Sequence, residues 1–185
     1  MGVAVRKLSW EDIKDFPESP GRTEIVDGEL IMSPTAGNRH QRMCSLLAIE
    51  LGLHVRTKML GLLFSSAVHV ILAKHTHYEP DLCFVASGRR SIVQESYIEG
   101  PPDLIVEVIS ESNRSHDTVV KFRDYARYGV REYWLVDPRE NLISTWRLEA
   151  DHYELLGRAA SGGQVTSRAL PELQLDPAQV LAEDF

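Results

Sequence analysis

The sequence has 185 residues, of which 43% are hydrophobic and 25% charged, and a formal net charge of −7. No apolar run approaches the roughly 20 residues that span a bilayer, and residues 1–10 lack the apolar core of a signal peptide, so we expect a cytoplasmic protein without membrane association. The length suits one domain over residues 1–185, and the negative charge opposes indiscriminate binding to nucleic acid while allowing a local basic patch.

The first 32 residues are predicted to form a short helix and a β-hairpin. Ser9, followed three residues later by Asp12, is typical of a capping box at a helix start. Asp27-Gly28 suits the two-residue turn of a hairpin over residues 23–32. Glu24 lies on the first strand of this hairpin, where the pattern fits a solvent-facing carboxylate and a functional one equally well.

Residues 39–55 carry apolar side chains at helical spacing, which predicts an amphipathic helix of about four turns. His40 lies in its first turn, with Arg39 and Arg42 beside it. A histidine in this position is more often a surface residue than a ligand, so the helical pattern alone assigns it no role.

Residues 64–77 are predicted to form a second hairpin followed by a polar turn. The hairpin is expected to turn at residues 65–67, and the polar turn covers residues 74–77. His75 and His77 have the spacing of a metal-binding pair. Without a carboxylate or cysteine accompanying them in the turn, this is a weak metal signal.

The next predicted strand covers residues 82–85 and is buried. Pro80 permits only a strand start or an edge position, so Asp81 is expected at the mouth of this strand. Residues 87–100 are expected to form an excursion over the surface.

The centre of the chain has the pattern of a strand, a helix and a second strand. Residues 103–109 and 132–136 are nearly continuous apolar runs, as expected of strands covered on both faces. Gly129 lies where the glycine that ends a helix belongs. Such a βαβ unit predicts that its two strands are parallel and adjacent. The apolar stripe expected along the helix consists of Val119, Phe122 and Ala126.

Glu107 is the one carboxylate inside the first of these strands. A buried, ionised carboxylate is costly unless a partner pairs with it, neutralises it or coordinates it. Because side chains alternate along a strand, Glu107 shares a face with Ile105 and Ile109. It could form a structural ion pair or lie at an exposed strand end, or it could be a metal ligand or catalytic acid at the edge of the sheet.

The C-terminal part is predicted to be mostly antiparallel. Residues 142–148 and 152–157 alternate as a pair of strands, and residues 170–185 are expected to add a short strand and a last helical turn after Asp176-Pro177.

Three polar groups of this predicted core could meet. Asp81 and Glu107 lie on separate strands, and with the backbone carbonyl of Val108 they offer the oxygen ligands that Mg²⁺ prefers. Lys121 follows on the helix and could orient a nucleophile or stabilise developing negative charge. Its alternative role is a solvated residue paired with Asp117 at i−4. Lys121 and Tyr125 share a helix face that differs from the apolar stripe.

The chain resembles the PD-(D/E)XK nuclease superfamily and, more narrowly, the bacterial putative restriction endonuclease family within it. The resemblance runs from about Glu24 to Pro138, with a weaker echo to Leu175, and its motifs are specific in combination. The matching motifs are residues 24–30 (EIVDGEL), 33–34 (SP), 39–41 (RHQ), 79–82 (EPDL), 102–109 (PDLIVEVI), Lys121 with Tyr125, and 129–138 (GVREYWLVDP).

This resemblance implies an α/β fold with a restriction-endonuclease-like core, a central mixed sheet flanked by helices, and additional antiparallel hairpins. It implies phosphodiester hydrolysis of DNA with Mg²⁺ or Mn²⁺, with Asp81 and Glu107 as metal ligands and catalytic residues. The lysine position of the (D/E)-x-K triplet holds Ile109, so Lys121 on the following helix is the candidate for that role. Glu24 and His40 also match family positions and are expected to extend the catalytic site.

Two other functions fit the same residues. One is a catalytically inactive nuclease-fold domain that serves as a nucleic-acid-binding or regulatory module, which the acidic net charge favours. The other is a structural domain in which Glu107 and Lys121 form a buried salt bridge. A homodimer is expected by analogy with enzymes that cut both strands.

Overall fold

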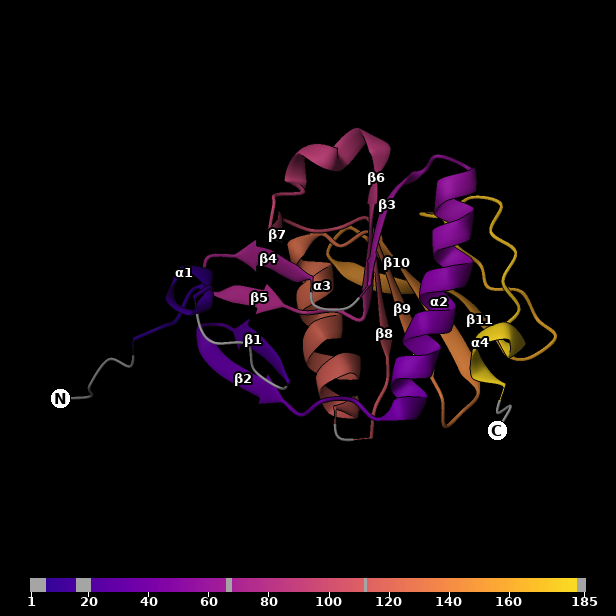
Figure 1. The fold of residues 1–185 in the computed structure, drawn as a ribbon, viewed down its shortest axis with the longest axis horizontal. Coiled ribbons are helices and arrows are strands. Elements are labelled where there is room, and N and C mark those ends of the chain that lie inside the picture. Colours follow the sequence, from indigo (N-terminus) through magenta and orange to yellow (C-terminus); the bar gives the residue numbers. More distant parts are fainter. Residues whose placement is uncertain (1–5, 16–20, 66–67, 112, 183–185) are drawn as a thin grey trace.

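The computed structural model describes residues 6–15, 21–65, 68–111 and 113–182. It contains two mixed β-sheets with helices packed between and around them (Figure 1). Within these residues, no helix has the combination of length and apolar character that a bilayer-spanning segment requires. The predicted α/β arrangement with a mixed central sheet, flanking helices and added antiparallel hairpins is confirmed.

The central sheet has six strands in the order β11-β10-β9-β8-β6-β3. The predicted parallel pair, β8 with β9, lies at its centre, and its other pairings are antiparallel. All residues of β8, β9 and the first four of β6 are buried. The strands are β3 (Gly61–Ser65), β6 (Leu82–Ala86), β8 (Leu104–Val108), β9 (Glu132–Asp137), β10 (Leu142–Glu149) and β11 (His152–Ala159).

The second sheet has five strands in the order β2-β1-β5-β4-β7. The predicted hairpin is confirmed, and Asp27 and Gly28 at its tip have φ values of 50° and 90°, as a type I′ turn requires. The strands are β1 (Arg22–Val26), β2 (Glu29–Ser33), β4 (His69–Ala73), β5 (Thr76–Tyr78) and β7 (Tyr97–Glu99).

Two apolar cores lie on opposite faces of the central sheet. Leu104, Val106 and Val108 of β8 pack with the buried face of α2 and with the C-terminal segment. Ile105 and Ile109 face the other way, toward α3 and the five-stranded sheet. The predicted alternation is therefore correct, and it directs Glu107 toward the α3 side.

The helices follow the predicted positions with two differences in detail. The capping box of Ser9 and Asp12 starts α1 (Trp10–Ile13), and Gly129 ends α3 (Phe122–Tyr128) at φ 89°. α2 (Asn38–Thr57) extends one residue before and two residues beyond the predicted range of 39–55. The crossover helix begins with a π-helical turn, η2 (His116–Lys121), which leads directly into α3. The remaining helices are the 3₁₀ segment η1 (Ser87–Ile92) and α4 (Ala178–Leu181).

The structure contradicts one of the three positions predicted for the apolar stripe of the crossover helix. Val119 was expected to face the core, yet it is 60% exposed, whereas Asp117 and Lys121 are buried. Val119 lies within the π-helical turn, which does not follow the 3.6-residue period that the prediction assumed. Phe122 and Ala126 pack in the α3-side core as predicted, so the inward face of this helix carries Asp117 and Lys121 together with apolar side chains.

The predicted hairpin over residues 64–72 is wrong. β3 pairs with β6 in the central sheet, and β4 pairs with β5 and β7 in the second sheet. Phe64 of β3 packs in the same α3-side core as Val70 of β4, so the two strands face each other from different sheets instead of pairing within one. Residues 66–67 of the predicted turn lie outside the described residues.

Two smaller predictions also need correction. The polar turn predicted at residues 74–77 is limited to Lys74 and His75, because Thr76 and His77 are buried in β5. The short strand expected after residue 170 is absent from residues 170–182, whereas the last helical turn after Asp176-Pro177 is confirmed as α4. Residues 183–185 of that prediction lie outside the described part of the chain.

Candidate functional site

Asp81 and Glu107 lie beside each other in the central sheet. β6 and β8 pair with Leu82 opposite Val106, so continuing the antiparallel register places Asp81 opposite Glu107. Both side chains are buried, and the Val108 backbone N–H donates to Asp81 Oδ2 at 2.7 Å. The two acids predicted to converge therefore do so, at the end of β6 that the chain enters.

Arg22 bridges these two carboxylates from β1. Its Nη2 donates to Asp81 Oδ1, and its Nη1 lies 3.5 Å from Glu107 Oε2. The Arg22 guanidinium therefore lies between Asp81 Oδ1 and Glu107 Oε2, so the space between the two acids holds one cationic group.

Lys121 lies on the other side of Glu107, at the centre of three carboxylates. Its Nζ is 2.9 Å from Glu107 Oε1, 3.0 Å from Glu24 Oε1 and 3.5 Å from Asp117 Oδ1. The Tyr125 hydroxyl also donates to Glu107 Oε1, at 2.9 Å. One oxygen of Glu107 is therefore held by the helix, and the other faces Arg22.

Glu24 is anchored from two directions. It accepts hydrogen bonds from Lys121 and from the Glu79 backbone N–H, and His116 Nε2 lies 2.7 Å from its Oε2. Of the two interpretations of Glu24 in the hairpin, the solvent-facing one is excluded, because this side chain is buried.

The charges of the site are unbalanced. Burial raises the pKa of Glu107 to about 8, since Lys121 and Arg22 only partly offset the loss of water. Burial also raises the pKa of Asp117. Burial works against ionisation of Glu24 as well, but Lys121 and His116 outweigh it and lower its pKa to about 2. Burial likewise disfavours the charge on Lys121, yet Glu107, Glu24 and Asp117 together raise its pKa above the usual value.

His40 connects this cluster to the surface. It lies in the first turn of α2 with its Nε2 3.2 Å from Asp81 Oδ2 and its Nδ1 3.5 Å from Cys44 Sγ. His40 and Ile109 line a cleft of about 450 Å³. The structure therefore places His40, to which the helical pattern assigned no role, between Asp81 and the cleft.

The sequence did not single out Arg22 or His116 as members of the site. Neither residue belongs to a chemical pattern in its own segment, and both reach the site only through the packing of the second sheet against the crossover helix. Asp117 was considered only as a surface partner of Lys121. The i, i+4 spacing was a signal for the contact itself, but it could not show that the pair is buried.

The residues fit a divalent cation. Asp81 Oδ1 and Glu107 Oε2 are hard oxygen donors directed at one cationic group, and the buried carboxylates Glu24, Asp81, Glu107 and Asp117 outnumber the permanently charged Arg22 and Lys121. Two other groups in the described part of the chain have donor atoms close enough to share a metal. They are His40 with Cys44 and Asp81, and His69 with His77 and Glu79.

A sequence family and a solved structure are similar to this chain. A family model described as "Putative restriction endonuclease" matches residues 10–178. The fold is similar to the crystal structure of a putative nuclease belonging to DUF820 from Anabaena variabilis, with a TM-score of 0.77 and 17% sequence identity over 94% of this chain and 97% of that chain. No curated protein matches the sequence. At this identity, the structural similarity establishes the fold and nothing finer.

Proposed function

Because the chain belongs to the putative restriction endonuclease family, which supports a nuclease-type function, we propose that it hydrolyses phosphodiester bonds in DNA with a divalent cation, Mg²⁺ or Mn²⁺. The observation that carries this proposal is the convergence of Asp81, Glu107 and Lys121. Asp81 and Glu107 would hold the cation through the two oxygens that now face Arg22. When bound, the cation supplies positive charge that acidifies water and offsets charge developing on the phosphate.

The remaining residues position the reacting groups in this proposal. Lys121 is held at a fixed point by Glu24 and Glu107, so its ammonium can orient a water molecule or stabilise negative charge without reorganising. Glu24 acts through Lys121 and is a positioning residue. His40 lies between Asp81 and the cleft, where it can contact a phosphate or carry a proton to the leaving group.

A basic rim supports a nucleic-acid substrate despite the acidic net charge. The cleft that His40 lines also contains Arg39, Arg114 and Arg139, with Glu111 as its one acidic side chain. Arg114 is paired with Asp137, at 2.8 and 2.9 Å, and Arg39 donates to the Pro138 carbonyl at 3.2 Å. Asp137 offsets the charge of Arg114, so Arg39 and Arg139 are the arginines that would meet a phosphate backbone at the mouth of the site.

Substituting the exposed Arg139 tests this rim. We expect Arg139→Gln to weaken DNA binding to a similar extent for all sequences and to lower the slope of log K against log [salt] by about 0.9, as for one lost phosphate contact. Fluorescence anisotropy at several salt concentrations measures both quantities. Lys58→Gln is the matched control, because Lys58 lies at the C-terminal end of α2, roughly 28 Å along the helix from Arg39 in its first turn. Equal slopes of log K against log [salt] for wild type and Arg139→Gln would show that Arg139 contacts no phosphate, which would contradict DNA binding at this cleft.

A cleavage assay tests the function itself. Purified protein is incubated with supercoiled, single-stranded and branched DNA in Mn²⁺, in Mg²⁺ and in EDTA, with the Glu107→Gln variant as the control for contaminating nucleases. We expect cleavage only with a divalent cation and only by the wild type. DNA binding without cleavage under every condition would support the inactive binding module instead.

A further inference from the structure

A second cluster of metal-binding side chains lies in the five-stranded sheet, apart from the candidate site. His69 is on β4, His77 is on β5, and Glu79 follows β5. The strands pair with Val70 opposite Tyr78, so the antiparallel register places His69 opposite Glu79 and diagonal to His77, all on one face. Of the two histidines that the sequence pattern paired, only His77 belongs to this cluster, because His75 is directed to the Leu8 carbonyl, 2.7 Å away.

The separations of the donor atoms match those of a tetrahedral metal site. His69 Nδ1 is 3.0 Å from His77 Nε2 and 3.5 Å from Glu79 Oε1. Zinc binds nitrogen and oxygen donors at about 2.0–2.2 Å, so two donors of a tetrahedron lie roughly 3.3–3.6 Å apart. All three donor atoms lie within 4.8 Å of one another. Small shifts therefore convert this arrangement into three corners of a tetrahedron.

The surroundings of the cluster hold these donors in place. The Trp10 ring packs over both imidazoles, with centroid distances of 4.5 Å to His69 and 4.9 Å to His77. The Thr23 backbone N–H donates to Glu79 Oε1 at 3.2 Å. Among the described residues, His77 Nδ1 has no hydrogen-bond partner, and His77 Nε2 contacts His69 Nδ1 within the cluster.

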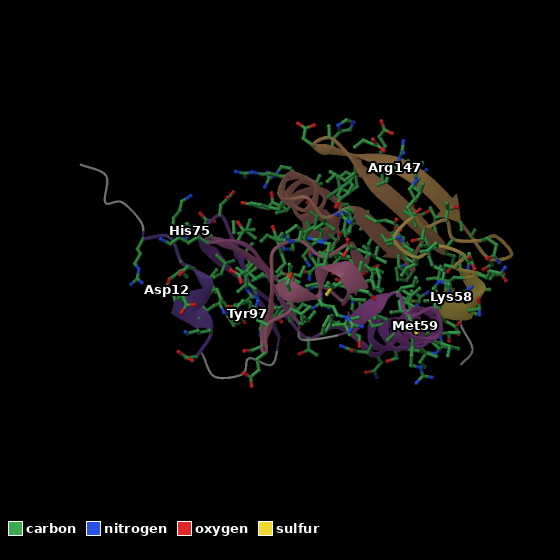
Figure 2. The ribbon with its side chains drawn as sticks, turned by 90° about the horizontal axis from the view of Figure 1, so that it is seen from above. Asp12, Lys58, Met59, His75, Tyr97 and Arg147 are labelled. Atoms are coloured by element: carbon green, nitrogen blue, oxygen red, sulfur yellow. The ribbon has the colours of Figure 1, made fainter. Side chains whose placement is uncertain are left out.

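The protonation and exposure of the cluster also suit a metal. Burial lowers the pKa of His69, and burial together with His69 lowers the pKa of His77 to about 3, so burial favours the neutral form in which imidazole binds a metal. The His69 side chain is 31% exposed and that of Glu79 11%, which leaves a path for solvent to a fourth position. The cluster lies where β4 and β5 meet α1 (Figure 1), at the end of the molecule where Figure 2 labels Asp12, His75 and Tyr97.

From this geometry we propose that His69, His77 and Glu79 form a zinc site with water as the fourth ligand. Two imidazoles favour zinc over Mg²⁺, which prefers oxygen donors alone. A bound ion would join β4, β5 and the segment before β6, and the Glu79 backbone N–H extends this connection to Glu24 at 3.3 Å. The site would thus stabilise the sheet from which Glu24 and Arg22 reach the candidate catalytic centre.

Cobalt and zinc titrations test the site independently of any nuclease activity. Cobalt in a tetrahedral site gives visible d–d absorption, and cysteine ligation adds a near-ultraviolet charge-transfer band. Wild type, His69→Gln and the control His75→Gln are each titrated with Co²⁺ and then with Zn²⁺ in competition with a chromophoric chelator. Cys44→Ser is included because Zn²⁺ could instead bind the cluster of His40, Cys44 and Asp81.

We expect one tight equivalent with visible absorption and no thiolate band in wild type, His75→Gln and Cys44→Ser. In His69→Gln the affinity should fall at least about 100-fold, since loss of a direct ligand exceeds the loss of an outer partner. Zinc should raise the melting temperature of wild type by about 5 °C or more at saturating concentration, and that of His69→Gln by less. Unchanged affinity in His69→Gln, or binding lost only in Cys44→Ser, would overturn the proposal.

Discussion

Replacing Glu107 with glutamine is expected to lower the DNA cleavage rate about a thousandfold and to weaken Mn²⁺ binding. The cation's charge stabilisation accounts for several kcal/mol of the barrier, and each 1.36 kcal/mol is a tenfold change in rate. Glutamine keeps the shape of the side chain and an oxygen that can accept from Lys121 and Tyr125. Calorimetric titration with Mn²⁺ and single-turnover cleavage measure the two effects. Cleavage within tenfold of the wild-type rate would exclude Glu107 as a metal ligand.

The same variant should fold at least as stably as the wild type in EDTA. Burial raises the pKa of Glu107 to about 8 from its ordinary value of 4.5, so between these values the folded protein holds a proton that the unfolded chain has lost. This group therefore lowers the free energy of unfolding as the pH rises through that window. We expect the stability advantage of Glu107→Gln to grow from pH 5 to pH 8, as measured by urea denaturation. A constant difference across this range would contradict the expectation.

The parts of the site that the sequence could predict follow from strand geometry. Alternation along residues 103–109 directed Glu107 away from Val106 and Val108, and the βαβ pattern required β8 and β9 to be parallel neighbours. The structure also pairs β6 with β8, which brings Asp81 to Glu107. These relations depend on side-chain period and chain connectivity, which a sequence displays directly.

The rest of the site depends on packing between elements that are distant in sequence. Arg22 and Asp81 are 59 residues apart, and His116 and Glu24 are 92 residues apart. The pattern around residues 116–121 predicted an ordinary α-helix, and it could not show that this segment is a π-helical turn or that Asp117 is buried with Lys121. The error at β3 and β4 has the same origin, since strands adjacent in sequence were assumed to pair, whereas β3 pairs with β6 and β4 pairs with β5 in the other sheet.

Replacing Lys121 with methionine is expected to cost about 3–5 kcal/mol of the free energy of unfolding. Methionine fills a similar volume but leaves Glu24, Glu107 and Asp117 buried without their shared cation, and losing one partner of a buried ion pair has a cost of this size. Lys58→Met is the matched control, because its exposed pair with Glu172 is worth at most about 1 kcal/mol. Denaturant unfolding in EDTA measures both.

A double-variant cycle identifies the origin of that cost. In the Glu107→Gln background, Lys121→Met leaves two buried carboxylates without their cation instead of three. The double variant should therefore lose less free energy of unfolding than the sum of the two single changes. If the two costs are instead additive, Glu107 and Lys121 do not interact in the folded state. A loss for Lys121→Met as small as that for Lys58→Met would mean that the ammonium is not the charge that holds these acids together. The catalytic role proposed for Lys121 requires the same fixed position, so it would fail with that result.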